Sequence, residues 1–135
     1  LDKLSSNSEG FDLGCGSGRW AKHFADKIKK MHCIDASSKA IEVAKTNLKK
    51  FNNCEFHIVS VDEISLKDNS MDFGYSLGVL HHLPYPLEGM KSCVKKLKKG
   101  SPLLIYLYYN FSIKPICNKF TLWEIKLFQA WNVTS

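Results

Sequence analysis

The chain has 135 residues, of which 44% are hydrophobic and 24% charged, and its formal net charge is +6. This composition excludes a disordered or low-complexity protein, and the length suits a single domain, residues 1–135, with a buried core. Apolar runs stay short of the roughly 18 residues that cross a bilayer, and the N-terminus has no signal-peptide pattern. Because the sequence starts at Leu1 rather than Met, we expect a fragment or trimmed product of a longer protein.

The cysteines and lysines bear on the environment of the chain. Single, scattered cysteines without a C-x-x-C pair predict a reduced, cytoplasmic protein and no zinc motif; they are Cys15, Cys33, Cys54, Cys93 and Cys117. Lysine-rich runs at 27–30, 45–50 and 91–99 permit attraction to RNA or another polyanion. Each run lies on an expected helix, so solvated helix faces are the first interpretation and an anion-binding surface is the alternative.

In the first half of the chain, hydrophobic spacing predicts alternating strands and helices. Strands are expected at about 10–13, 31–34 and 55–59. Apolar residues at i, i+4 and i+8 predict a helix over about 19–30, and Ser37 or Ser38 is expected to cap a second helix. The buried positions of these two helices are expected to be Trp20, Phe24, Ile28, Ile41, Ala44 and Leu48.

The second half continues the alternation. Strands are expected at 71–77, where Gly78 ends the strand, and at 103–109, and a helix from Pro86 to a stop at Gly100 is expected between them. We therefore expect an α/β fold, a Rossmann-like and mostly parallel sheet with helices on both faces and five visible strands. The stripes expected to be buried are Leu87, Met90, Val94 and Leu97, and, in a last helix, Ile116, Phe120, Trp123, Leu127 and Trp131.

The segment Asp12-Leu13-Gly14-Cys15-Gly16-Ser17-Gly18-Arg19 is the most informative part of the sequence. Its G-x-G-x-G spacing differs from the G-x-G-x-x-G of dinucleotide-binding proteins, because Arg19 occupies the position of the last dinucleotide glycine. A pyrophosphate avoids nearby negative charge, so the carboxylate of Asp12 favours a ligand that carries a cation. The alternatives are a turn without a ligand and a local hydrogen bond accepted by Asp12 that shapes the turn.

Asp35 ends the second expected strand, about 20 residues after the glycine turn. An acid at this position reaches the ribose hydroxyls of an adenosine in this topology. The alternative is that Asp35 acts only with Ser37 and Ser38 at the start of the next helix.

Two further motifs follow the third and fourth strands. Ser60-Val61-Asp62-Glu63-Ile64 precedes an Asp-Asn-Ser turn at 68–70, and Leu80-His81-His82-Leu83 follows Gly78. With the glycine segment, these stretches resemble the class I S-adenosylmethionine-dependent methyltransferases, in particular those acting on small molecules and lipids. The resemblance implies that these residues bind S-adenosylmethionine, or S-adenosylhomocysteine as product: Asp12, Gly14, Cys15, Gly16, Gly18, Asp35, Ala36, Ser60, Val61, Asp62, Leu77 and Gly78. The family's adenine-contacting acid falls on Ser60, so Ser60, the Val61 backbone and Asp62 remain alternatives for that contact.

The resemblance implies transfer of a methyl group to an O, N or C nucleophile of a small molecule. His81 or His82 is the candidate general base, with capping or packing as the alternative, and adjacent side chains are expected to diverge and to hold no metal. Tyr106, Tyr108 and Tyr109 are candidates to contact the acceptor or to join the core.

The family also supplies an expectation about the end of the sheet. Its terminal antiparallel hairpin is not visible in the sequence. We expect the hairpin to lie beyond Ser135 or to be lost, and its absence would leave an apolar sheet edge open to pairing with another copy. Rival functions are a degenerate cofactor-binding or assembly domain and an RNA methyltransferase. A dinucleotide oxidoreductase is disfavoured by Arg19 and Asp12.

Overall fold

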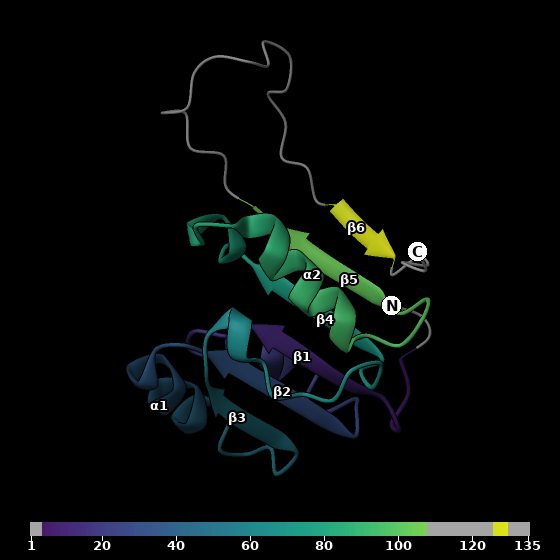
Figure 1. Ribbon diagram of the computed structural model, residues 1–135. Coiled ribbons are helices and arrows are strands. Elements are labelled where there is room, and N and C mark those ends of the chain that lie inside the picture. Colours follow the sequence, from purple (N-terminus) through teal and green to yellow (C-terminus); the bar gives the residue numbers. More distant parts are fainter. Residues whose placement is uncertain (1–3, 108–125, 130–135) are drawn as a thin grey trace.

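The computed structural model describes residues 4–107 and the backbone of residues 126–129. Six strands form one sheet in the order β3-β2-β1-β4-β5-β6 (Figure 1). The first five strands are mutually parallel, and β6 runs antiparallel to β5. The strands are β1 (Glu9–Leu13), β2 (Lys30–Asp35), β3 (Cys54–Ile58), β4 (Phe73–Leu77), β5 (Pro102–Tyr106) and β6 (Lys126–Gln129).

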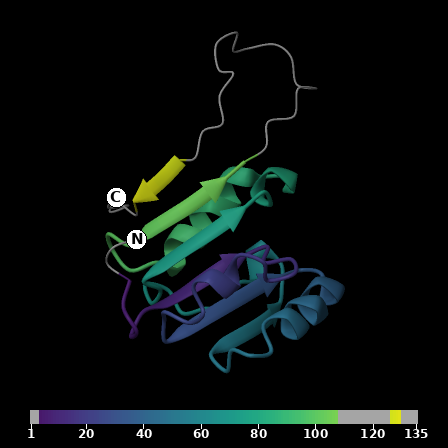
Figure 2. The same cartoon turned by 180° about the vertical axis from the view of Figure 1, so that it is seen from behind.

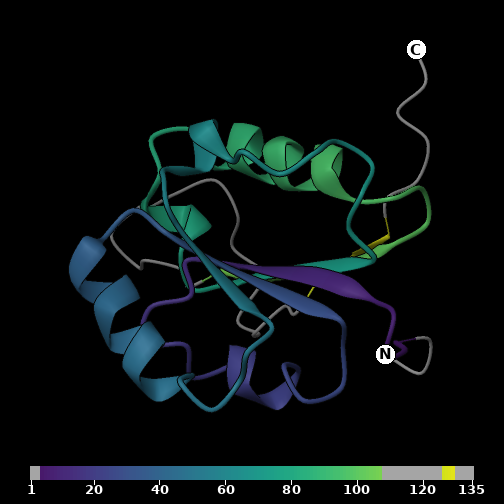
Figure 3. The same cartoon turned by 90° about the horizontal axis from the view of Figure 1, so that it is seen from below.

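Helices cover both faces of the sheet, as the sequence predicted. The helices α1 (Ser38–Asn47) and α2 (Pro86–Lys96) lie on opposite sides of it (Figure 3), and α1 is in front in the view from behind (Figure 2). Three 3-10 turns occupy the connections after β1, β3 and β4: η1 (Ala21–His23), η2 (Val61–Glu63) and η3 (Leu80–His82). No helix in the described ranges is long and apolar enough to span a membrane. The Rossmann-like α/β prediction is confirmed.

β1 has few apolar residues, yet it lies in the middle of the sheet. Its packing against β4 explains this position. Gly10 pairs with Phe73 and Phe11 pairs with Gly74 in the parallel register. A Cβ on Gly10 would lie 2.2 Å from the Phe73 ring, and one on Gly74 would lie 2.2 Å from the Phe11 ring. Each glycine therefore makes room for the aromatic ring of the other strand, and close packing locks the two strands together.

The helix predictions hold for α1 and shift for α2. Ser37 caps α1, since its Oγ accepts a hydrogen bond from the Ala40 N–H at 3.3 Å, and the three predicted core residues of α1 are buried. In α2, Leu87 is 62% exposed, whereas Gly89 and Cys93 are buried. Gly89 lies against Leu83, where a Cβ would come within 2.7 Å. The small Gly89 thus lets α2 pack closely against its neighbours. The predicted buried face missed this residue because it was based on the spacing of large apolar residues.

Two boundaries predicted from sequence are wrong. The helix α2 ends at Lys96, so Gly100 is not its stop; Gly100 lies in a turn closed by the Ser101 N–H and the Lys98 carbonyl at 3.0 Å. Residues 19–29 form η1 and turns rather than a helix, residue 30 already belongs to β2, and Trp20 is 44% exposed. Asn53, far away in the sequence, donates hydrogen bonds to the carbonyls of residues 25 and 28, at 2.6 and 2.9 Å. This side chain satisfies carbonyls that a continuing helix would have bonded, so the apolar spacing alone misled.

The C-terminal prediction also needs correction. Leu127 belongs to β6 and not to a helix, and its backbone pairs with Leu104 of β5. The outer edge of β5 offers unpaired N–H and C=O groups that a strand satisfies and a helix does not. β6 therefore covers the edge that we expected to be free for another copy, and it supplies an antiparallel strand that the sequence pattern did not show. The other residues of the predicted last helix, with Cys117, Tyr108 and Tyr109, lie outside the described residues.

Candidate functional site

The glycine turn leaves β1 at the edge of the sheet where the parallel strands end. Gly14, Gly16 and Gly18 all have positive φ angles, of 75°, 52° and 74°. The N–H groups of Gly14 and Cys15 both donate to the carbonyl of Ile34, at 2.7 and 3.0 Å, so the turn is held against the end of β2. A Cβ on Gly16 would meet nothing within 4 Å, so this turn presents bare backbone beside open space.

Asp35 points at that backbone. Its Oδ2 accepts a hydrogen bond from the Gly16 N–H and its Oδ1 accepts one from the Ser37 N–H, both at 2.9 Å. The side-chain cap of α1 comes from Ser37, so Asp35 is more than a helix cap. Each carboxylate oxygen has a second lone pair, which leaves capacity for further donors. Ala36, beside it, is exposed.

Asp12 is buried at 2% exposure, and its Oδ2 has no hydrogen-bond partner among the described residues. Burial raises the pKa of Asp12 to about 7, an effect that the neighbouring Tyr75 hydroxyl reduces and the charge of Asp35 increases. Burial likewise raises the pKa of Tyr75. A buried carboxyl oxygen without a donor suits a ligand that supplies an N–H or a positive charge.

The end of β4 closes the site from the other side. Gly78 has a φ of 75°, and its N–H donates to the carbonyl of Tyr106 at 2.8 Å, while Leu77 is half-buried at the strand end. Val79 packs directly on the glycine turn, because a Cβ on Gly14 would lie 2.2 Å from Val79 Cγ2. Val79 was not among the candidates from sequence, although its position directly after Gly78 at this edge of the sheet was the available signal.

His81 and His82 lie in η3, and their rings are close together. The ring centroids are 4.0 Å apart, so the expectation that the two side chains diverge is wrong; the tight 3-10 turn brings them to the same side. Burial, and next the neighbouring His82, lower the pKa of His81, which favours its neutral, proton-accepting form. His82 is exposed.

The stretch after β3 is also brought to this edge. The Val59 N–H donates to the Asp35 carbonyl at 3.2 Å, so η2 starts close to Asp35. The side chain of Val61 is buried in the core, Asp62 is exposed, and Ser60 precedes η2 with its carbonyl bonded to the Glu63 N–H at 3.1 Å. The three candidates for the adenine contact therefore offer different groups. Ser60 offers a hydroxyl, Val61 its backbone N–H and C=O, and Asp62 a carboxylate.

Arg19 is exposed, with its guanidinium carbon 5.1 Å from the centroid of the Trp20 ring, and it starts no helix. No α-helix follows the glycine turn within residues 14–30, so the helix N-terminus that holds a pyrophosphate in dinucleotide-binding folds is not formed there. This arrangement agrees with the sequence argument against a dinucleotide.

Comparisons with known proteins place the chain among relatives. It is 37% identical over 104 residues to a probable cobalt-precorrin-6B C(15)-methyltransferase (decarboxylating) of Methanococcus maripaludis, covering 73% of this chain and 55% of that protein. It is 29% identical over 91 residues to the ubiquinone biosynthesis O-methyltransferase of Nitrosomonas europaea, covering 66% and 39%. The chain thus spans about half or less of the length of these relatives.

Solved structures share the fold. The N-methyltransferase NodS of Bradyrhizobium japonicum WM9, solved with S-adenosylhomocysteine, superposes with a TM-score of 0.68 at 22% identity, covering 73% of this chain and 52% of that one. The family described as "Methyltransferase domain" matches residues 11–105, from β1 to β5. The chain therefore belongs to the methyltransferase domain family, which confirms its resemblance to the class I S-adenosylmethionine-dependent methyltransferases.

Proposed function

We propose that this chain binds S-adenosylmethionine and transfers its methyl group to an O, N or C nucleophile of a small molecule. The observation that carries the proposal is the open glycine turn flanked by two carboxylates, one buried without a donor and one aimed at the turn backbone. The relatives and structural neighbours of the chain include O-, N- and C-methyltransferases, which supports this choice of chemistry.

Each candidate residue has a role that follows from its position. Asp12 would pair with the ligand's ammonium group, and Asp35 would accept hydrogen bonds from the ribose hydroxyls with its remaining lone pairs. Gly16 leaves room for the methionyl carbons, and Ser60 or Asp62 would contact the adenine. Together they fix the ligand at the ends of β1, β2 and β3.

When bound, the cofactor supplies a methyl group on a positively charged sulfur. Displacement at this sulfonium disperses charge instead of creating it, so the chain's task is to align the acceptor with the methyl carbon and to exclude water. Leu77 and Gly78 would border the transferred methyl group. His81 would accept the acceptor's proton, and its lowered pKa favours the neutral form that this role needs; His82 is the alternative.

Isothermal titration of the full chain with S-adenosylhomocysteine, NAD and single-stranded RNA tests the proposal. We expect binding of S-adenosylhomocysteine alone, and a loss of roughly 10-fold or more in Asp35→Ala, because a hydrogen bond to a charged group contributes about 1.5–3 kcal/mol. Asp26→Asn, at an exposed acid in the turn after η1, is the matched control and should bind normally. Binding of NAD, or none of the three ligands, would contradict the proposal.

A methyl-transfer assay separates an enzyme from a binding-only domain. The chain is incubated with labelled S-adenosylmethionine and a panel of small phenols and amines. We expect transfer that depends on His81 or His82, measured with His81→Ala and His82→Ala. Cofactor binding with no transfer to any acceptor would favour the rival, a degenerate cofactor-binding or assembly domain.

An RNA methyltransferase is the second rival, and the lysine-rich runs are its motivation. Several of these lysines are already engaged in ion pairs: Lys29 with Glu9, Lys30 with Glu55, Lys91 with Glu88, Lys96 with Asp68 and Lys98 with Asp72. These ion pairs reduce the positive potential that a polyanion would meet. They support the interpretation that the lysine-rich runs are solvent-exposed faces and not an RNA-binding surface. Salt-sensitive RNA binding in the same titration would favour the rival.

We also propose a reduced, cytoplasmic environment. The four cysteines in the described residues, Cys15, Cys33, Cys54 and Cys93, are all free thiols, which supports this choice. Since β6 covers the β5 edge, an oligomer would need a different surface; sedimentation velocity of the full chain measures its state directly.

A further inference from the structure

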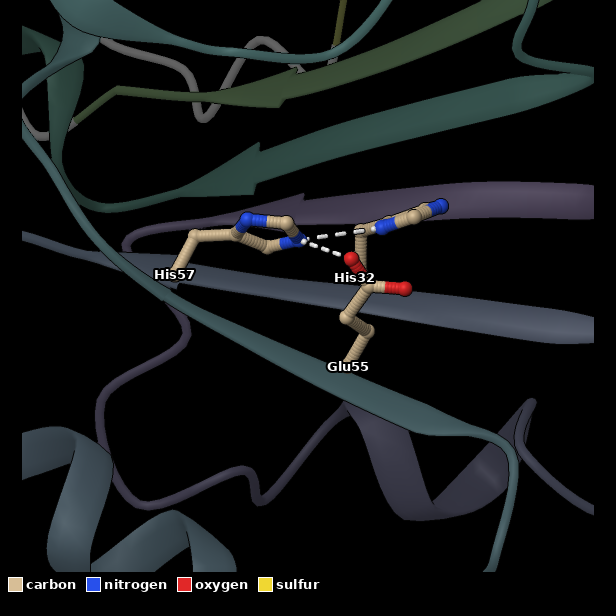
Figure 4. Close-up of side chains that lie close together, drawn as sticks. All are labelled: His32, Glu55 and His57. Carbon is tan, nitrogen blue, oxygen red and sulfur yellow. Dashed lines mark hydrogen bonds and ion pairs between the residues drawn. The ribbon is translucent and has the colours of Figure 1, made fainter.

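Two histidines and a glutamate lie together on β2 and β3 (Figure 4). In the parallel register His32 pairs with Glu55 and Ile34 pairs with His57. Side chains two residues apart on a strand share a face, so all three project from the same side of the sheet. One nitrogen of each ring and a carboxylate oxygen lie within 4.8 Å of one another.

Two distances within this cluster are close to those between ligand atoms around a small metal ion, and the third is at most 4.8 Å. His32 Nδ1 is 3.0 Å from His57 Nε2, and His57 Nε2 is 3.6 Å from Glu55 Oε1. A tetrahedral zinc ion with bonds of about 2.0–2.1 Å holds its ligand atoms roughly 3.3 Å apart. An ion therefore fits between the three atoms with small side-chain movements.

The surroundings of His32 prepare its Nδ1 as a ligand. The other ring nitrogen, Nε2, is buried without a hydrogen-bond partner in the described part of the chain, and Glu9 Oε2 lies 3.9 Å from it. A proton on Nε2 faces this carboxylate, which leaves the Nδ1 lone pair directed at His57. Metal-bound histidines commonly donate their second N–H to a carboxylate in this way.

The charged residues around the cluster leave one carboxylate oxygen of Glu55 available as a metal ligand. Lys30 Nζ lies 3.1 Å from Glu55 Oε2, so Oε1 is the oxygen left for His57. Lys29 pairs with Glu9 Oε1 at 2.8 Å and leaves Oε2 for His32. The negative charges of the two carboxylates are nearly balanced by the positive charges of the two lysines. Such a site lacks the excess of negative oxygen ligands that Ca²⁺ and Mg²⁺ prefer. Imidazole donors instead suit zinc and its neighbours in the transition series.

We propose that His32 Nδ1, His57 Nε2 and Glu55 Oε1 form a binding site for Zn²⁺. The side chains of Glu55 and His57 are 48% and 15% exposed, so solvent reaches the site and supplies the fourth ligand. The ion would replace the His–His hydrogen bond and tie the edge strand β3 to β2. This role is independent of methyl transfer.

Thiols on the opposite face of the sheet are the alternative ligands for added Zn²⁺. The thiol of Cys33 interacts there with those of Cys15 and Cys54, in the core that α1 covers. Zinc bound by thiolates would be evidence for that cluster and against the histidine site. The experiment must therefore distinguish nitrogen and oxygen ligands from sulfur.

Calorimetric titration of the chelator-treated full chain with Zn²⁺ is the first test. We expect one ion per chain, with binding lost in His57→Ala and in Glu55→Gln and kept in His23→Ala, an exposed histidine outside the cluster. Glu9→Gln should weaken binding by about 10–100-fold, the usual effect of removing an outer carboxylate. Circular dichroism checks that each variant is folded. No binding by the wild-type chain, or equal binding by His57→Ala, would overturn the proposal.

Co²⁺ in place of Zn²⁺ reports the ligands of the wild-type chain without any substitution. We expect visible absorption of a four-coordinate ion without an intense near-ultraviolet sulfur-to-metal band. Such a sulfur band would assign the ion to the cysteines and contradict the site proposed here.

Discussion

The ends of β1 and β2 each carry a carboxylate beside the same glycine turn, and the two groups are in opposite situations. Asp35 is half-buried and already accepts hydrogen bonds from Gly16 and Ser37. Asp12 is buried, and one of its oxygens has no donor in the described structure. Asp35 thus builds the turn even without a ligand, whereas Asp12 weakens the fold unless a ligand supplies a partner. A functional site commonly carries such a local cost.

The largest expected effect is the pH dependence that Asp12 imposes on stability. Because burial raises the pKa of Asp12 from its usual 3.8 to about 7, the folded chain holds this proton more tightly than the unfolded chain. Stability should therefore fall as pH rises through the window from about 4 to 7, by about 4 kcal/mol for a shift of roughly three pKa units. Urea unfolding at pH 5 and pH 8 measures the part of this loss that falls above pH 5, about 2.7 kcal/mol for two of the three pKa units.

Asp12→Asn is the matched variant, because it keeps the shape and removes the titration. Its loss of stability between pH 5 and pH 8 should be smaller than that of the wild-type chain by about 2.7 kcal/mol, the part of the Asp12 effect in this range. If the free energies of unfolding of the wild-type chain and the variant changed in parallel with pH, Asp12 would not be a buried carboxyl with a raised pKa.

The next largest effect is a loss of stability that differs between two glycines of the turn. In Gly14→Ala a positive φ and a Cβ 2.2 Å from Val79 act together, so we expect a loss of about 2–5 kcal/mol. In Gly16→Ala only the positive φ opposes folding, at about 1–2 kcal/mol, but the new methyl group enters the open space next to Asp35. Urea unfolding and S-adenosylhomocysteine titration should show Gly16→Ala folded and unable to bind. Normal binding by this variant would place the ligand elsewhere.

Gly74→Ala tests the β1–β4 contact, which lies outside the site. Its Cβ would lie 2.2 Å from the Phe11 ring, so we expect the free energy of unfolding to fall by about 1–3 kcal/mol. S-adenosylhomocysteine affinity at a temperature where the variant stays folded should be nearly unchanged. A stability equal to that of the wild-type chain would argue against this packing.

The smallest effect concerns Val79. Truncation to alanine removes a half-buried contact with Gly14 and should cost about 1 kcal/mol. Combined with Gly14→Ala, it should recover part of the stability that Gly14→Ala loses, since the clash is relieved. Additive losses in this double-mutant cycle, measured by urea unfolding, would show that the two residues do not touch.

The alternation of elements was predictable because strands, caps and breakers leave local signals. The cap at Ser37 and the buried face of α1 depend on residues within a few positions of one another. The turns over 19–29, in contrast, depend on Asn53, and β6 depends on an edge of β5 that lies about 20 residues before it in sequence. Such long-range partners leave no trace in local periodicity, which is why both segments were assigned to helices.

The same distinction holds at the site. Asp12 and the glycines were found from a short motif, and their positions follow from the end of a single strand. Val79 was missed, because only its contact with Gly14 across two parallel strands gives it a role. The cluster of His32, Glu55 and His57 was missed for the same reason, since the register of β2 with β3 brings it together.

A crystal structure of the full chain with S-adenosylhomocysteine tests the central claim most directly. We predict the ligand's ribose hydroxyls within hydrogen-bond distance of Asp35, its methionyl carbons against Gly16, and its ammonium group facing Asp12. A ligand bound at another surface, or a glycine turn filled by protein side chains with Asp35 turned away, would contradict the account.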